Sequence, residues 1–176
     1  MPMPHRNSAT KATLFKGLML LTLLGAGKYS LRAMKPEYVK GILGYFAQIL
    51  EATLGIPFHW VAGSGFRNDA LHVVIDHSCV GSGFFMLLVA LGLWHLPLGN
   101  FRRALLISPL LLLVAACTTL VVNSVRLVVV FFFFTRFPFW ETRLEILHIA
   151  TGVFLFATSL IAYHALLIHL FKKSPA

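Results

Sequence analysis

Three stretches of the chain are strongly apolar and contain no aspartate, glutamate, lysine or arginine: residues 80–96, 104–122 and 147–171. At the 1.5 Å rise of an α-helix, a stretch of about 17 to 25 residues crosses the roughly 30 Å hydrocarbon core of a bilayer. The pattern therefore predicts three transmembrane helices.

Residues 11–34 form a fourth candidate span with a shorter uncharged centre. Lys16, Lys28 and Arg32 would have to extend their charged ends toward the two interfaces. The first 30 residues also resemble a signal peptide, but Gly25 to Tyr29 makes a poor cleavage site. We expect a retained first helix, and hence about four transmembrane helices in all.

The segment between this candidate and residue 58 has the period of an amphipathic helix. Its polar and small positions recur every three or four residues, at Glu37, Lys40, Gly44, Gln48 and Glu51. The helix could lie flat in the interface or cross the membrane with this stripe turned inward, and the flat alternative is preferred. Residues 58–76 then predict a short extracytoplasmic hairpin or extended loop.

Composition agrees with this pattern, because 58% of the residues are hydrophobic, 12% are charged and the mean hydropathy is +0.81. The sequence predicts an all-α integral membrane protein with a single domain over residues 1–176. The net charge of +9 comes from basic residues scattered between apolar runs. This distribution favours anionic lipid headgroups and argues against nucleic acid as a partner.

Basic residues also predict how the chain is oriented. The loop "PLGNFRR" and the tail "FKKSPA" are short and basic, so both should be cytoplasmic. Counted from these ends, Cys79, Arg126 and His148 lie roughly 27, 34 and 36 Å away along a helix. All three should therefore reach the extracytoplasmic surface of the plasma (inner) membrane, although four lysines and arginines between residues 28 and 40 would lie outside as well.

Arg126 alone interrupts the otherwise uncharged run from 104 to 134, where an ionisable residue is costly. It is a functional candidate, with an arginine extending from a helix end as the alternative. Asn123 shares its helix face and could orient the guanidinium or a substrate. A helix over the whole run would be about 46 Å long, so we expect a break or bend after Arg126, followed by an aromatic turn at "RFPFWETR".

Two other residues carry candidate chemistry. Cys79 has polar neighbours in "DHSCVGSGFF", whereas Cys117 lies in the middle of an apolar run and should serve packing. Neither cysteine belongs to a CxxC pair, so we expect no metal and no cofactor. His148 begins the last apolar stretch, one turn before Gly152, and is either a functional base or an ordinary interfacial histidine.

The order "SCVGSGFF", "NSVR" and "HIATGVFLF" resembles the exosortase and archaeosortase family of membrane transpeptidases, over roughly residues 72–160. The chain resembles a compact form such as the exosortase K type, although Val80 stands where many members carry a small polar residue. The resemblance implies a catalytic set of Cys79, Arg126 and His148. It also implies a substrate: exported proteins with a carboxy-terminal sorting tail, made of a short motif, a transmembrane helix and a basic end.

The implied chemistry is acyl transfer through a thioester. Cys79 would be the nucleophile, His148 the proton carrier and Arg126 the group that binds the developing oxyanion. Gly81 and Gly83 would let a substrate backbone approach closely, or else serve helix packing.

Two other functional classes fit parts of the sequence. A rhomboid-like intramembrane serine protease would use Ser82 within "GSG" together with His148. A non-enzymatic haem-binding or structural membrane subunit would use His95, His148 and His164.

Overall fold

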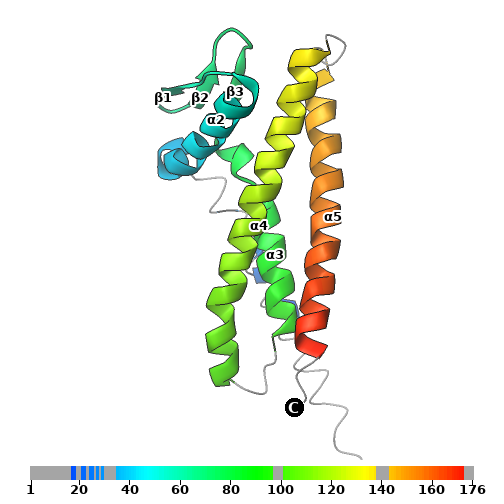
Figure 1. Ribbon diagram of the computed structural model, residues 1–176. Coiled ribbons are helices and arrows are strands. Elements are labelled where there is room, and N and C mark those ends of the chain that lie inside the picture. The colour runs from blue at the N-terminus through cyan, green and yellow to red at the C-terminus, as the bar shows by residue number, and fades with distance from the viewer. Residues whose placement is uncertain are drawn as a thin grey trace, which may run out of the picture.

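The computed structural model describes residues 17, 18, 21, 22, 24, 25, 27, 29, 35–96, 101–137 and 143–172. Three long helices dominate this part of the chain: α3 (Ser82–His95), α4 (Phe101–Arg136) and α5 (Leu144–Lys172) (Figure 1). Each belongs to a helical run long and apolar enough to cross a bilayer, namely His77–His95, Leu106–Arg136 and Glu145–Phe171. By length and composition these are the helices of a multi-pass membrane protein, as predicted.

The predicted span at residues 11–34 falls largely outside the described residues. Its described members, which lie between Gly17 and Tyr29, are helical. Gly27 lies against the Met86 side chain of α3, whose end would have to move to admit a Cβ.

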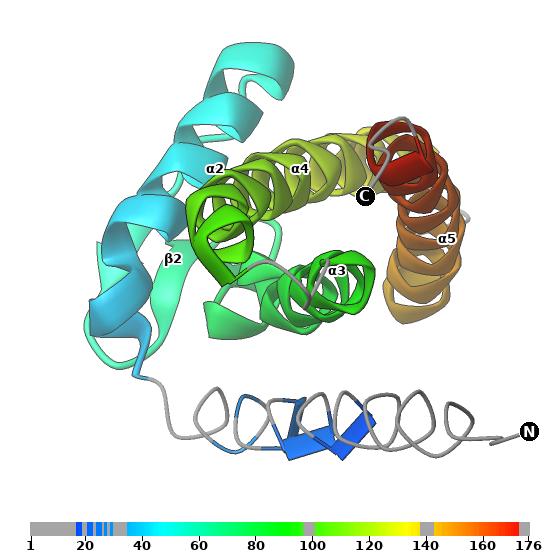
Figure 2. The ribbon, with the colours of Figure 1, turned by 90° about the horizontal axis from the view of Figure 1, so that it is seen from below.

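The three long helices pack directly on one another, and Figure 2 shows α3 lying beside both α4 and α5. Their shared core is aliphatic and aromatic, and it includes Phe84, Leu88, Leu111, Ala115 and Tyr163. In lipid, such close packing of complementary side chains holds the helices together, because the apolar surroundings supply no hydrophobic drive.

The expectation that the helix breaks after Arg126 is wrong, because α4 continues without interruption to Arg136 and is 36 residues long. The turns of α4 beyond Arg126 are covered on one face. There, Leu127 and Phe131 are buried in a second apolar cluster together with residues between Val39 and Cys79. The predicted aromatic turn at 136–143 lies mostly outside the described residues.

The elements that cover α4 form a small cap, which consists of a 3₁₀ turn, one helix and a three-stranded sheet. It begins with a 3₁₀ turn, η1 (Pro36–Val39), and α2 (Lys40–Leu54), which ends where Gly55 adopts a left-handed φ of 67°. The apolar face of α2 is buried, with Leu43, Phe46, Ala47 and Leu50 inside. The polar stripe faces outward except for Gly44, which lies against Phe66.

The 15 residues of α2 extend about 22 Å, which is short of a bilayer core. Figure 2 looks along the long helices and shows α2 lengthwise, so this helix lies across their direction. This is the geometry of the flat alternative.

The rest of the cap is a three-stranded antiparallel sheet with the order β1 (His59–Val61), β2 (Gly65–Asn68) and β3 (Val73–Ile75). The predicted hairpin is thus present, and it is extended by a third strand.

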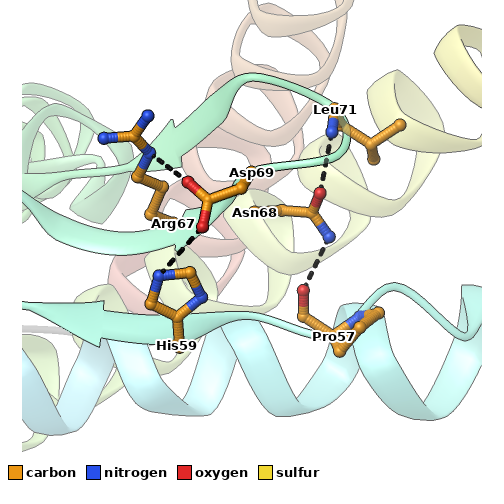
Figure 3. Close-up of polar contacts among 6 residues, drawn as sticks. All are labelled: Pro57, His59, Arg67, Asn68, Asp69 and Leu71. Carbon is orange, nitrogen blue, oxygen red and sulfur yellow. Dashed lines mark hydrogen bonds and ion pairs between the residues drawn. The ribbon is translucent and has the colours of Figure 1, made fainter.

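Side chains at the end of β2 fix the sheet's loops (Figure 3). The buried Asn68 donates from Nδ2 to the Pro57 carbonyl at 2.7 Å, and its Oδ1 accepts from the Leu71 N–H at 2.8 Å. Asp69 is 2.6 Å from Arg67 Nε and 3.4 Å from His59 Nε2. Because both polar atoms of the buried Asn68 side chain are paired with backbone groups of the flanking loops, Asn68 holds the β2–β3 connection in place.

The turn between β1 and β2 is tied to η1. The Glu37 carboxylate accepts a hydrogen bond of 2.9 Å from the Gly63 N–H. The backbone N–H groups of Glu37 and Gly63 both lower the pKa of the Glu37 carboxyl, so it is charged at neutral pH. Beside this link, the Lys40 ammonium lies 4.9 Å from the centre of the Trp60 ring.

Candidate functional site

Cys79 is held in a short, tightly hydrogen-bonded segment between the sheet and α3. The segment is the 3₁₀ turn η2 (His77–Val80), which Asp76 caps by accepting from the Ser78 N–H at 2.9 Å and the Ser78 hydroxyl at 2.5 Å. The Cys79 N–H donates to the Asp76 carbonyl at 3.0 Å. The backbone position of Cys79 is therefore set before any ligand arrives.

Cys79 and His148 line the same cavity, which has a volume of about 400 Å³. The cavity lies where the cap meets the long helices. Its other lining residues come from the β3 segment, η2, α4 and the first turn of α5: His72, Val73, Val74, Ile75, Asp76, Ser78, Leu127, Val130, Phe131 and Glu145. The thiol-bearing residue is 9% exposed, and His148 is half-buried.

Arg126 is buried next to this cavity, with 6% of its surface exposed, and is not among the lining residues. It interacts electrostatically with both Cys79 and His148. Its guanidinium lies 5.0 Å from the Phe156 ring and packs against Gly152. Within the described part of the chain it forms no ion pair, and its Nε and Nη2 have no hydrogen-bond partner.

A buried cation with free N–H groups is costly unless negative charge reaches it. Among the described groups, a negative charge on the Cys79 sulfur would interact favourably with Arg126. The arrangement is therefore suited to stabilise an anion at or near the sulfur.

Asn123 connects α4 to the cysteine segment. It is fully buried, and its Nδ2 donates to the Val80 carbonyl at 2.9 Å. Its Oδ1 has no partner among the residues that the structure describes. Asn123 was expected to orient the guanidinium or a substrate, and the contact observed is instead with the backbone next to Cys79.

The two glycines predicted to support the site differ from each other. Gly81 has a left-handed φ of 73°, is buried, and leaves no room for a Cβ beside the Asn123 amide. Gly83 is exposed, and a Cβ there would meet nothing within 4 Å. Gly81 is thus needed for close packing, and the group that packs against its backbone is the Asn123 side chain.

Neither alternative site has all of its residues together. Ser82 lines a different pocket of about 220 Å³, with residues of α2 and α4 such as Ile42 and Thr119. His95 and His164 lie 3.1 Å apart, Nε2 to Nδ1. Since His164 follows His148 by 16 residues of one helix, the two are about 24 Å apart.

Sequence reasoning missed four residues near the site. Glu145 precedes His148 by three positions on α5, and this helical spacing was a usable signal. Phe156 continues the series His148, Gly152 at intervals of four. His72 has a left-handed φ of 52°, which has no signal in the sequence pattern. Asp76 caps η2, and an aspartate directly before a helical turn was a usable signal.

Comparison with known proteins adds no family to this description. No family model, no curated protein and no solved structure matches the chain.

The different surroundings of Gly81 and Gly83 generate a paired prediction. Gly81→Ala should lower the thermal stability in detergent and reduce activity at the Cys79 site, since it combines about 1–2 kcal/mol of left-handed strain with overlap on Asn123. Gly83→Ala, two residues away in the first turn of α3, should leave both unchanged or slightly raise the melting temperature. Equal effects of the two substitutions would contradict the packing described here.

Proposed function

We propose that this chain is a membrane-embedded cysteine transpeptidase or protease of the exosortase type. It would cleave carboxy-terminal sorting tails of exported proteins through a thioester and transfer the acyl group to an acceptor. The observation that carries the proposal is that Cys79 and His148 line one cavity, while the buried and unpaired Arg126 interacts with both.

In the first step, the Cys79 thiolate attacks the carbonyl carbon of the scissile peptide bond. A carbon–sulfur bond forms, and the carbonyl oxygen becomes an oxyanion. The rigid η2 turn supports this role, because a nucleophile that is already positioned loses little entropy on reaction.

Arg126 would stabilise negative charge first on the sulfur and then on the oxyanion. Two of its N–H-bearing nitrogens are free of partners, and burial makes each charge interaction stronger than it would be in water. A guanidinium is suited to this role because it stays charged and presents several donors in a fixed plane.

His148 would carry the proton. It accepts the proton of the Cys79 thiol as the thiolate forms, and it gives this proton to the leaving amine nitrogen as the carbon–nitrogen bond breaks, which leaves a thioester on Cys79. It then takes a proton from the incoming amine, hydroxyl or water as this nucleophile attacks the thioester and releases the thiolate. The half-buried position of His148 in the cavity that Cys79 lines supports both transfers.

The two rival functions have less support. A serine protease would need Ser82 and His148 in contact, but they line different pockets. A haem site would need one or two histidines free to bind the iron. His95 and His164 are hydrogen-bonded to each other, and His148 lies at the far end of the bundle from both.

Partners and location follow from the same proposal. The resemblance assigns exported, tail-bearing proteins as substrates. The basic 97–103 loop and the basic tail support an active site at the extracytoplasmic face of the plasma membrane.

Substitution of the three residues tests the mechanism. Cys79→Ala should reduce cleavage of a tail-bearing substrate at least a thousandfold, and Cys79→Ser nearly as much, because a hydroxyl ionises far less readily than a thiol. Arg126→Lys and His148→Ala should each cost about a hundredfold or more. The activity loss in the double variant Arg126→Lys/His148→Ala should be much smaller than the product of the two single losses, because the effects of residues in one catalytic set do not multiply.

The measurement is the fraction of substrate cleaved in membranes at matched enzyme levels. Cys117→Ala serves as the control for loss of a thiol, since Cys117 is exposed on the surface of α4 and should be dispensable. If Cys79→Ala processes substrate normally and Ser82→Ala does not, the thiol mechanism is wrong and the serine protease replaces it.

Orientation has its own test. In a chain without native cysteines, Ser64→Cys in the exposed β1–β2 turn should react with a membrane-impermeant maleimide added to intact spheroplasts. Ser174→Cys in the basic tail should react only after permeabilisation. The opposite pattern would place the cavity on the cytoplasmic side.

A further inference from the structure

β3 is an edge strand with an unpaired side. It pairs with β2 through Asn68↔Val73, Arg67↔Val74 and Phe66↔Ile75. Among the described residues, no other strand or loop forms backbone hydrogen bonds with it. Alternate N–H and C=O groups of β3 therefore point away from the sheet without a backbone partner.

The β3 edge is short, but it carries none of the charged side chains, prolines or bulges that commonly protect an edge against strand addition. β3 has the sequence Val-Val-Ile, and Val74 is 43% exposed. The opposite edge, β1, differs: His59 lies beside Asp69, and Lys40 covers Trp60.

The unprotected edge also lies at the candidate active site. All three residues of β3 line the cavity that Cys79 and His148 line. The chain then runs from Ile75 directly into the Asp76-capped turn, and Cys79 follows Ile75 by four residues. An extended peptide lying along β3 would thus end beside the thiol.

We infer that the substrate binds by adding a strand to the free edge of β3, with the segment on the amino-terminal side of the scissile bond parallel to β3. This inference rests on the proposed function. Parallel pairing follows from direction, because β3 runs toward Cys79 and the acyl segment must end there. The main-chain hydrogen bonds formed in this way hold a peptide in register regardless of its side chains.

This binding mode defines the substrate class. The segment before the cleaved bond is extended and free of helix, and it lacks proline wherever its N–H faces β3. Its side chains alternate, so every second one faces into the cavity, where Leu127, Val130 and Phe131 form an apolar wall. Apolar residues are therefore favoured at alternate positions.

The test uses a peptide that reacts covalently with the thiol. The probe is acetyl-Thr-Val-Thr-Val-Ala chloromethyl ketone, from which the Cys79 thiolate displaces chloride. Two matched probes carry a single backbone N-methyl group, one on the second threonine and the other on the second valine. The Cys117→Ala enzyme leaves Cys79 as the sole thiol, and mass spectrometry measures the rate at which Cys79 is alkylated.

Strand addition predicts a difference between neighbouring positions. One N-methyl isomer should react about tenfold more slowly than the parent peptide, because its N–H faces β3. The other should react at nearly the parent rate, because its N–H faces away. Iodoacetamide, which needs no peptide contacts, should show unchanged thiol reactivity throughout.

Similar rates for all three peptides, or no reaction of Cys79 with any of them, would overturn the inference. Equal slowing of both N-methyl isomers would overturn it as well, because it would show no alternation. These rates measure peptide binding next to Cys79 and not turnover. The alternation can therefore be observed even if Cys79 proves dispensable for cleavage, and it can be absent even if Cys79 proves essential.

Discussion

The buried charge of Arg126 is the constraint on which the rest of this site depends. A guanidinium that is 6% exposed, with two nitrogens lacking partners, is unfavourable unless an anion comes within reach. Phe156 offsets part of this cost through its ring face, and Gly152 leaves space for the side chain. Under the proposed function, Cys79 and the substrate oxygen would be the groups that this positive charge stabilises.

The cap keeps that charge away from water. α4 extends ten residues beyond Arg126, and its outer turns bury Leu127 and Phe131 under α2 and the strands. The same apolar cluster includes Cys79 and Ile75, so the packing that stabilises the cap also positions Cys79. Asn123 completes the arrangement by joining α4 to the Val80 carbonyl. Fold stability and site geometry are therefore supplied by the same contacts.

Hydrophobic pattern predicted the parts of the fold that lipid dictates. Uncharged stretches identified α3, α4 and α5, and the three- and four-residue spacing of polar residues identified α2. The rarity of charge in an apolar run identified Arg126. The break expected after Arg126 is absent. Bilayer thickness alone does not limit the length of α4, because the cap covers one face of the turns beyond Arg126. The third strand and the contact of Asn123 with Val80 depend on tertiary packing that local pattern does not encode.

Detection of the covalent intermediate tests the central claim most directly. Membranes containing the enzyme and a tail-bearing substrate would be quenched in acid during turnover, and the peptides of the enzyme analysed by mass spectrometry. The account predicts an acyl adduct on the peptide that contains Cys79, located on its sulfur and removed by neutral hydroxylamine, as a thioester is. A hydroxylamine-resistant adduct on Ser82, or turnover with no adduct on Cys79, would contradict it.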